Sequence, residues 1–221
     1  QTLPILANVL LSGESGQLKV TATDLEVEIT ASALAVMDDA FQITLPARKF
    51  IDICKALPDG AALSIDIEND KATVRSGRGR YVMGTLPARD YPNIEATASS
   101  HVFQLPMTVF KRLLEKTAFA MAQQDVHYYL DGMLLEIRAD RIRTVATDGH
   151  RLALAEATLD VDQELDFQVI LPRKAVIELA KMLEDKDEAL RVELSNSHVC
   201  FSTSHFRFTS KLVDGRFPDY E

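Results

Sequence analysis

The sequence lacks several features that would assign it to a large class of proteins. It has no tryptophan and only two cysteines, Cys54 and Cys200, among 221 residues. Both cysteines lie in apolar stretches, so we expect buried free thiols in a reducing cytoplasm. No apolar run approaches the roughly 18 residues of a membrane-spanning helix, and there is no secretory signal. We therefore expect a cytoplasmic protein.

Motifs that carry catalytic or metal chemistry are also missing. None of the five histidines is spaced with cysteines or carboxylates as metal ligands are. There is no Gly-x-Ser-x-Gly elbow and no Gly-Lys-Ser/Thr phosphate loop. Residues 76–80 (SGRGR) are rich in glycine, but they lie between apolar segments and favour a strand-turn-strand over a phosphate cradle. We expect no metal and no cofactor.

Composition predicts ordered domains and gives the chain an acidic surplus. Apolar residues make up 47% of the sequence and charged residues 26%, which suits packed cores. The length leaves room for one large domain or two smaller ones. The formal net charge of −9 argues against nucleic-acid binding, because nucleic-acid binders usually carry a basic surplus.

The most informative feature is an internal repeat. Four short motifs recur in the same order at a nearly constant shift of 124 to 126 residues. A period of this length indicates duplicated domains. The matched stretches are residues 9–11 with 133–135, 21–24 with 145–148, 45–49 with 171–174, and 89–92 with 215–218.

Each copy predicts an α+β domain with an antiparallel sheet and helices on one face. Alternating apolar and polar residues predict strands at 18–23, 25–30, 62–67 and 190–194. Helices are predicted after Pro46 and Pro172, which suit the first helical position, and over residues 107–120. The first copy shows no counterpart of this last helix.

We therefore expect a first domain over residues 1–100 whose N-terminal part, about 25 residues, is missing. A second domain is expected over residues 101–221, with the boundary at the small residues 98–100. The chain begins without methionine, so we expect an ordered fragment of a longer protein.

Basic pairs open the predicted helices of both copies. Arg48-Lys49 and Arg173-Lys174 lie in the first helical turn, where the helix dipole disfavours cations by roughly 0.3–1 kcal/mol each. Lys111-Arg112 is expected to open the third helix in the same way, and Lys181 shares a face with Lys174. One interpretation is a basic helix surface inside an acidic shell, giving weak phosphate contact. The alternative is a solvated face without function.

Asp148 and His150 form the one pair that suggests catalysis. They lie two residues apart in an apparent turn, and the first copy has Asp24-Leu25-Glu26 there, without histidine. A structural turn is the favoured interpretation. A small hydrolase or transferase using Asp148 and His150 remains an alternative, as does a duplicated scaffold that does not bind DNA.

Three longer stretches resemble one known family. Residues 118–134 (AFAMAQQDVHYYLDGML), 144–153 (TVATDGHRLA) and 210–220 (SKLVDGRFPDY) are similar to motifs of the bacterial DNA sliding clamps, the beta subunits of DNA polymerase III. The likeness also includes residues 3–6 and the helix after Pro46. It runs the length of the chain.

The resemblance implies duplicated DNA-clamp domains, with sheets outside and helices lining the inner face of a head-to-tail homodimeric ring. Such a ring has three similar domains per chain, of which the third would be absent here, encircles double-stranded DNA and is not an enzyme. The implied DNA-facing residues are Arg48, Lys49, Gln124, Tyr128, Tyr129, Arg173 and Lys174. The two tyrosines are equally compatible with a strand-entry core.

The resemblance also implies two protein interfaces. A groove for short linear peptides of the polymerase, the clamp loader and repair proteins would be formed by Leu130, Thr147, Gly149, His150, Arg151, Leu152 and Pro218. Its other wall would belong to the third domain. The first-domain side of the dimer contact would include Lys49, Ile53, Leu57, Arg80, Tyr81 and Met83. The family pattern expected at positions 81 and 83 is an aromatic residue and then a leucine, and Tyr81 and Met83 depart from it conservatively.

Overall fold

The computed structural model describes residues 3–94, 98–123, 129–138, 140–159 and 165–221. These residues form two compact units, unit 1 (Gln1–Ile94) and unit 2 (Glu95–Glu221), which are described separately. Within the described residues, no helix is both long enough and apolar enough to cross a membrane.

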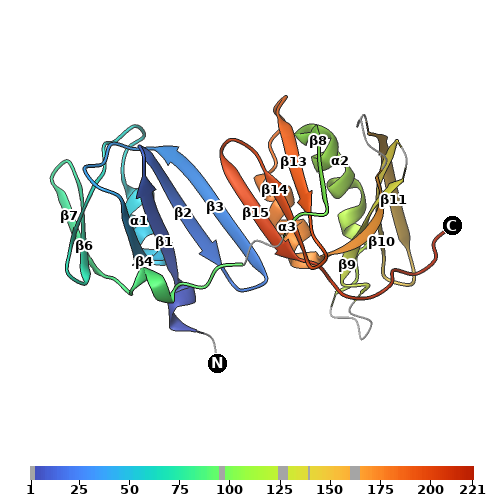
Figure 1. Cartoon of the computed structure of the whole chain (residues 1–221), viewed down its shortest axis with the longest axis horizontal. Coiled ribbons are helices and arrows are strands. Elements are labelled where there is room, and N and C mark those ends of the chain that lie inside the picture. Colours follow the sequence, from blue (N-terminus) through green and yellow to red (C-terminus); the bar gives the residue numbers. More distant parts are fainter. Residues whose placement is uncertain (1–2, 95–97, 124–128, 139, 160–164) are drawn as a thin grey trace. The chain divides into compact units, whose positions relative to one another are not determined.

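Unit 1 contains two antiparallel sheets and one α-helix (Figure 1). The larger sheet has the strand order β4-β1-β2-β3, and the smaller one has the order β5-β6-β7. Helix α1 connects the two sheets. The elements are η1 (Pro4–Ala7), β1 (Asn8–Glu14), β2 (Gln17–Thr23), β3 (Val27–Leu34), β4 (Phe41–Pro46), α1 (Ala47–Ala56), β5 (Ser64–Glu68), β6 (Lys71–Ser76), β7 (Gly79–Gly84) and η2 (Ala88–Asp90).

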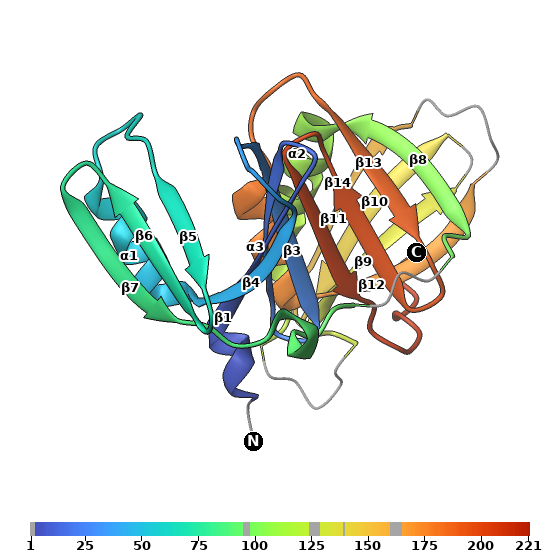
Figure 2. The same ribbon diagram turned by 60° about the vertical axis from the view of Figure 1, so that its left-hand side comes forward.

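Unit 2 repeats this succession and adds a strand and a helix in front of it (Figures 1 and 2). One antiparallel sheet has the order β11-β10-β9-β12, and the other has β15-β14-β13-β8. The elements are β8 (His101–Pro106), α2 (Met107–Thr117), η3 (Ala118–Ala120), β9 (Gly132–Arg138), β10 (Arg141–Thr147), β11 (Leu152–Thr158), β12 (Asp166–Pro172), α3 (Arg173–Met182), β13 (Ala189–Leu194), β14 (His198–Ser202) and β15 (Phe206–Lys211).

The order β1-β2-β3-β4-α1-β5-β6-β7 in unit 1 matches β9-β10-β11-β12-α3-β13-β14-β15 in unit 2. This agreement confirms the predicted α+β class with antiparallel sheets in two copies. The glycine-rich stretch at 76–80 is a strand-turn-strand, as expected, because β6 ends at Ser76 and β7 begins at Gly79.

Each α-helix follows a proline that ends a strand. Pro46, Pro106 and Pro172 have φ of −57°, −60° and −59° and extended ψ, and each is the N-cap of its helix. The expected first helical position for Pro46 and Pro172 is therefore wrong by one residue, because both prolines still pair with the neighbouring strand β1 or β9. Helix α2 begins at Met107, which places Lys111-Arg112 in its second turn and corrects the expectation that this pair opens the helix.

The core of unit 2 lies between the sheets and the two helices. Helix α2 packs against β10, β11 and α3, and it buries Phe110, Leu113 and Leu114. The Phe110 ring stacks on Phe201 of β14 with centroids 5.1 Å apart. The hydroxyls of Thr117 and Thr144 both donate to the carbonyl oxygen of Leu113, so the buried polar groups where α2 meets β10 are satisfied.

Helix α1 of unit 1 has no buried residue, in contrast to α3. Among residues 3–94, α1 packs against β1 and β4. Phe50 and Ile53 contact the core of this unit and are only partly buried. Cys54 is exposed, which corrects the expectation of a buried thiol, whereas Cys200 is buried as predicted.

Candidate functional site

The turn between β10 and β11 is built by its own polar side chains. The Thr147 hydroxyl donates to the carbonyl oxygen of Arg151 at 2.7 Å and accepts from the Gly149 N–H at 3.1 Å. Asp148 Oδ1 accepts from the N–H groups of His150 and Arg151, both at 3.0 Å, and Oδ2 pairs with the Arg151 guanidinium at 3.0 Å. These bonds leave Asp148 committed to holding the turn.

The same turn occurs in unit 1 between β2 and β3. The Thr23 hydroxyl donates to Val27 and accepts from the N–H of Leu25, while Asp24 Oδ1 accepts from Glu26 and Val27. Gly149 has φ of +83° and Leu25 has +78°, so the backbone conformation is shared as well. The interpretation of 147–152 as a structural turn is confirmed.

The catalytic alternative for Asp148 and His150 finds no support in this geometry. Backbone N–H groups of Arg151 and His150 hold the pKa of the Asp148 carboxyl below its usual range, so it is a poor proton acceptor. The His150 side chain is exposed and its equivalent in unit 1 is Glu26. Among the described residues, no three His, Cys, Asp or Glu side chains are grouped to hold a metal ion.

Gly149 supplies a testable property of this turn. A Cβ at Gly149 would meet no atom within 4 Å, so Gly149→Ala changes only the backbone preference. At φ of +83°, alanine costs about 1 kcal/mol of unfolding free energy, measured by urea denaturation. Gly149→Asn is the control, because asparagine tolerates this conformation, and we expect it to lose less. Equal losses would show that the backbone angle is not the cause.

An apolar row crosses the face of sheet β11-β10-β9-β12 that points away from α2. Ile170, Leu134, Val145 and Leu154 are neighbours on successive strands. Side chains alternate along a strand, and the flanking Met133 and Leu135 face the helix side, so this row faces the other way. Three of its members are buried, but Leu154 on the edge strand β11 is 43% exposed.

The residues that cover this row come from the C-terminal segment (residues 212–221). Phe217 packs into the cluster formed by Leu134, Val145 and Ile170, with Val213, Tyr220 and Tyr129 at its margin. The apolar surface therefore continues from beneath this segment onto β11, where Leu152 is 49% exposed beside Thr147. Thr147, Leu152 and Pro218 of the predicted groove thus lie around one apolar surface.

The remaining groove residues are arranged unequally. Leu130 is buried, while Gly149, His150 and Arg151 are exposed at the turn. The Arg151 guanidinium lies 5.6 Å from the ring centroid of Phe119, which is itself 60% exposed. Sequence reasoning did not single out Phe119, Val145 or Leu154. The alternation of apolar and polar residues over 152–158 places Leu154 on the same face as Leu152 and could have identified it. The contact between Phe119 and Arg151 depends on the packing of η3, which the sequence pattern does not give.

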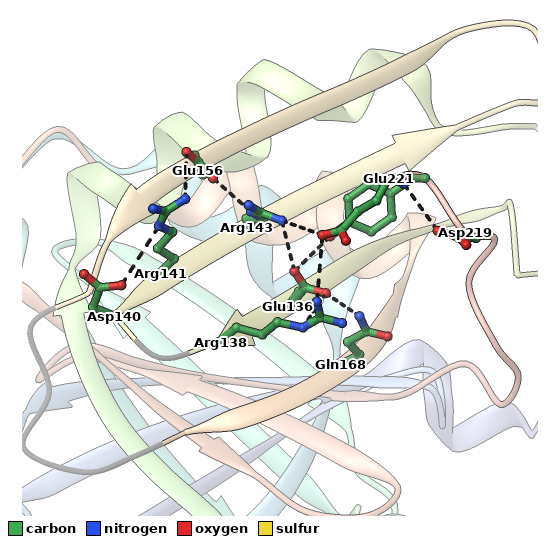
Figure 3. Close-up of polar contacts among 10 residues, drawn as sticks. Glu136, Arg138, Asp140, Arg141, Arg143, Glu156, Gln168, Asp219 and Glu221 are labelled. Carbon is green, nitrogen blue, oxygen red and sulfur yellow. Dashed lines mark hydrogen bonds and ion pairs between the residues drawn. The ribbon is translucent and has the colours of Figure 1, made fainter.

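A polar network lies beside the apolar row on the same face (Figure 3). Its centre is Glu136 of β9, which is 1% exposed and accepts a hydrogen bond from Tyr220 Oη at 2.8 Å. Burial raises the pKa of Tyr220, so its hydroxyl keeps its proton and donates. Arg143 of β10 pairs with Glu136 at 3.5 Å and with Glu156 of β11 at 2.8 Å. The sequence analysis assigned no role to these residues.

The basic helix starts differ between the two units. In α1, Arg48 is exposed and lies 3.9 Å from Asp52, and Lys49 is also exposed. In α3, Arg173 is half-buried and its guanidinium donates to the carbonyl oxygens of Met121 and Ala122 at 3.4 and 3.5 Å. Arg173 therefore helps to hold the chain before residue 124.

Other predicted basic positions are engaged in ion pairs. Lys111 is largely buried and pairs with Asp185 at 2.9 Å, and Lys181 pairs with Glu178 at 2.9 Å. Lys174 is exposed at the start of α3.

Gln124 and Tyr128 lie outside the described residues. Tyr129 packs at the margin of the apolar cluster, which favours the core interpretation for this residue.

The predicted dimer residues lie on α1 and β7. Arg80 and Tyr81 are exposed on β7, an edge strand of its sheet, and Lys49 is exposed on α1. Ile53 packs on the core of unit 1, and Leu57 is half-buried. Met83 is 4% exposed and packs in that core, so its side chain is not accessible for contact with another chain.

Comparisons with known proteins identify the family to which both α+β units belong. Residues 1–95 match the family model described as DNA polymerase III beta subunit, N-terminal domain, and residues 104–219 match its central domain. The chain belongs to the DNA polymerase III beta subunit family. The resemblance found in the sequence is confirmed.

Relatives in this family include the beta sliding clamps of Pseudomonas putida and Escherichia coli strain K12. They are 48% and 50% identical over 100% and 99% of this chain. A crystal structure of the DNA polymerase III subunit beta from Pseudomonas aeruginosa is 47% identical, has a TM-score of 0.95 and is matched over 100% of this chain. The chain spans about 60% of the length of these relatives and of that structure.

Proposed function

We propose that this chain is part of a DNA sliding clamp, a non-catalytic protein that encircles duplex DNA and tethers the replicative polymerase. Family membership along the whole chain is the observation that carries the proposal. Units 1 and 2 would be the first and second of three clamp domains, since the matching models describe an N-terminal and a central domain. We place this function in the bacterial cytoplasm.

Contact with DNA would come from the starts of α1 and α3. Lys49 and Lys174 are exposed in the first turns of these helices, and neither first turn contains an acidic residue. Cations at the positive end of a helix dipole cost stability, and phosphate binding gives a reason for that cost in both units. Arg48 belongs to this set, whereas Arg173 would act mainly by holding the preceding segment. Gln124 and Tyr128 remain proposals from the resemblance.

Peptides of polymerase and repair proteins would bind beside the β10–β11 turn. An apolar surface that ends in half-exposed leucines next to an arginine suits a short peptide with an apolar end. Leu152 and Leu154 offer the apolar contact, and Arg151 offers donors. Thr147, Gly149 and Asp148 fix the turn, and Leu130 is buried.

A head-to-tail homodimeric ring would use the surface of α1 and β7. Lys49, Arg80 and Tyr81 are accessible there, and β7 is an edge strand that can pair with another strand. Ile53 and Leu57 would complete the contact at their exposed edges. Met83 is omitted because it is buried within unit 1.

Truncating Leu152 tests the groove. Leu152→Ala removes an apolar contact from a side chain that is only half-covered in the free chain, so we expect about tenfold weaker binding of a labelled peptide ending in Leu-Phe. Arg151→Ala is expected to weaken binding as well. Fluorescence anisotropy titration measures both.

The matched control is Leu25→Ala. Leu25 is an exposed leucine in the equivalent turn of unit 1, which lacks the apolar row. Its substitution should leave peptide affinity unchanged. Absence of saturable binding by the full-length protein, or equal effects of the leucine variants at positions 25 and 152, would remove the groove from unit 2.

A further inference from the structure

The contacts that hold the C-terminal segment on the sheet of unit 2 include three anchors. The N–H of Val213 donates to the carbonyl oxygen of Ile170 at 2.9 Å. Phe217 is buried in the apolar cluster, and Tyr220 Oη donates to Glu136 at 2.8 Å. Pro218, a proposed groove residue, lies between the second and third of these anchors, so both determine its position.

Between the first two anchors the segment packs loosely. A cavity of about 270 Å³ lies along 212–217, lined on the sheet side by Gln168, Val169 and Ile170. Beyond this stretch, the segment is held by Phe217, by the Tyr220 hydroxyl and by the ion pair of Glu221 with Arg143.

Glu136 is the fixed point of the third anchor. It is almost fully buried, and its carboxylate also accepts from Gln168 Nε2 and pairs with Arg138 and Arg143, each at 3.5 Å (Figure 3). A buried carboxylate is costly unless it is paired and hydrogen-bonded, and this one has donors from three strands and from the segment. Removing any one donor leaves the buried carboxylate of Glu136 with one partner fewer.

Arg143 extends the network to the other side of the groove. Its Nε pairs with Glu156 at 2.8 Å, and Nη1 pairs with Glu221 at 3.2 Å. Glu156 lies on β11, the edge strand that carries Leu152 and Leu154. One set of polar contacts thus connects the strand and the segment that would form the two margins of the groove (Figure 3).

Unit 1 lacks this network although it has the same register. The positions matching Glu136, Arg143 and Gln168 are Ser12, Lys19 and Gln42, so no carboxylate occupies the centre. Tyr91, the counterpart of Phe217, donates instead to the backbone oxygens of Asn8 and Thr21. The buried carboxylate is therefore present only in the unit that carries the apolar row.

We propose that Glu136 and Tyr220 are positioning residues for the peptide groove. They fix the position of the C-terminal segment relative to β11 without contacting the peptide. The inference rests on the proposed groove and deepens it. When the Tyr220 anchor is lost, the segment spends part of its time undocked, and peptide affinity falls in proportion to the docked fraction.

Tyr220→Phe is the sharpest test, because it removes one hydroxyl and keeps the ring that packs on the cluster. We expect about threefold to tenfold weaker binding of the labelled peptide ending in Leu-Phe, measured by anisotropy on the full-length protein, in which the third domain would complete the groove. Hydrogen exchange should rise at 213–220 and stay unchanged in α2. Glu136→Gln, which keeps shape but removes charge, should weaken binding at least as much.

The control is Glu193→Gln. Glu193 is a partly buried carboxylate that pairs with Arg191 and Arg207 on the other sheet of unit 2. Its neutralisation should leave peptide affinity unchanged. If the parent binds and the Tyr220→Phe chain binds equally well, the positioning role is wrong while the groove stands. If the full-length parent itself does not bind, the groove is wrong and this inference falls with it. If Glu193→Gln weakens peptide binding as much as Tyr220→Phe does, the loss reflects general destabilisation of unit 2, and the positioning role of Tyr220 is wrong.

Discussion

Gly132→Ala is expected to lower the free energy of unfolding of unit 2 by about 3 kcal/mol. Gly132 begins β9 opposite Pro172, the last residue of β12. A Cβ at this position would lie 2.6 Å from the carbonyl oxygen of Leu171 and 2.7 Å from Ile170 Cγ2. The oxygen belongs to the backbone of a paired strand, so relief requires that β12 move. Urea denaturation followed by far-ultraviolet circular dichroism measures the loss.

The control for this prediction is Gly84→Ala in β7. A Cβ at Gly84 would meet no atom within 4 Å, and we expect a change within about 0.5 kcal/mol. A Gly132 variant that unfolds at the same urea concentration as the parent would show that β12 shifts without cost. A shift of β12 would also affect the start of α3, because the Arg173 N–H donates to the carbonyl oxygen of Asp131, the residue before Gly132, at 2.8 Å.

The second large effect is expected on DNA. Reversing Lys49 and Lys174 together to glutamate should lower the affinity for duplex DNA by at least about tenfold per lysine at ~0.1 M salt. The slope of log K against log salt should fall by about one for each lysine, because each releases a counterion when it binds a phosphate. A salt series of anisotropy titrations with a labelled duplex gives both quantities.

Arg173 is left out of this double variant for a structural reason. Its guanidinium donates to Met121 and Ala122, so its replacement would disturb the chain before residue 124 as well as the charge. Lys49 and Lys174 are exposed, so we expect their reversal to leave the cores of both units in place.

A control of equal charge separates local contact from net charge. Lys19 and Lys211 lie on exposed strand positions that alternate with core residues, so they point away from the helices. Reversing this pair changes the net charge by the same amount, and we expect a much smaller loss. Equal losses from both pairs would mean that the acidic surplus alone governs DNA affinity, and the proposed helix surface would be wrong.

The sequence by itself determined the features that depend on neighbours along the chain. Alternation of apolar residues predicts the strands, because successive side chains point to opposite faces. Prolines at 46 and 172 mark where a strand ends and a helix begins, apart from one residue in the boundary. The turn at Asp148 is encoded locally, since its bonds join residues no more than four apart. The repeat and the family resemblance also follow from short motifs.

Only the tertiary structure decided which of these surfaces are covered and which charges are paired. Cys54 and Met83 both lie in apolar patterns, yet Cys54 on α1 is exposed and Met83 on β7 is buried in the core of unit 1. Alternation assigns a side chain to a face but does not say what lies over that face.

Ion pairs and hydrogen bonds between residues far apart in the sequence were likewise decided only by the tertiary structure. Lys111 meets Asp185 across 74 residues, and Tyr220 meets Glu136 across 84. These groups approach one another only when the whole unit folds. The sequence alone does not indicate which acidic residue becomes the partner of Lys111 or of Tyr220. The physical reason is that hydrogen bonds and ion pairs depend on distance in space, which a sequence pattern constrains only over a few residues.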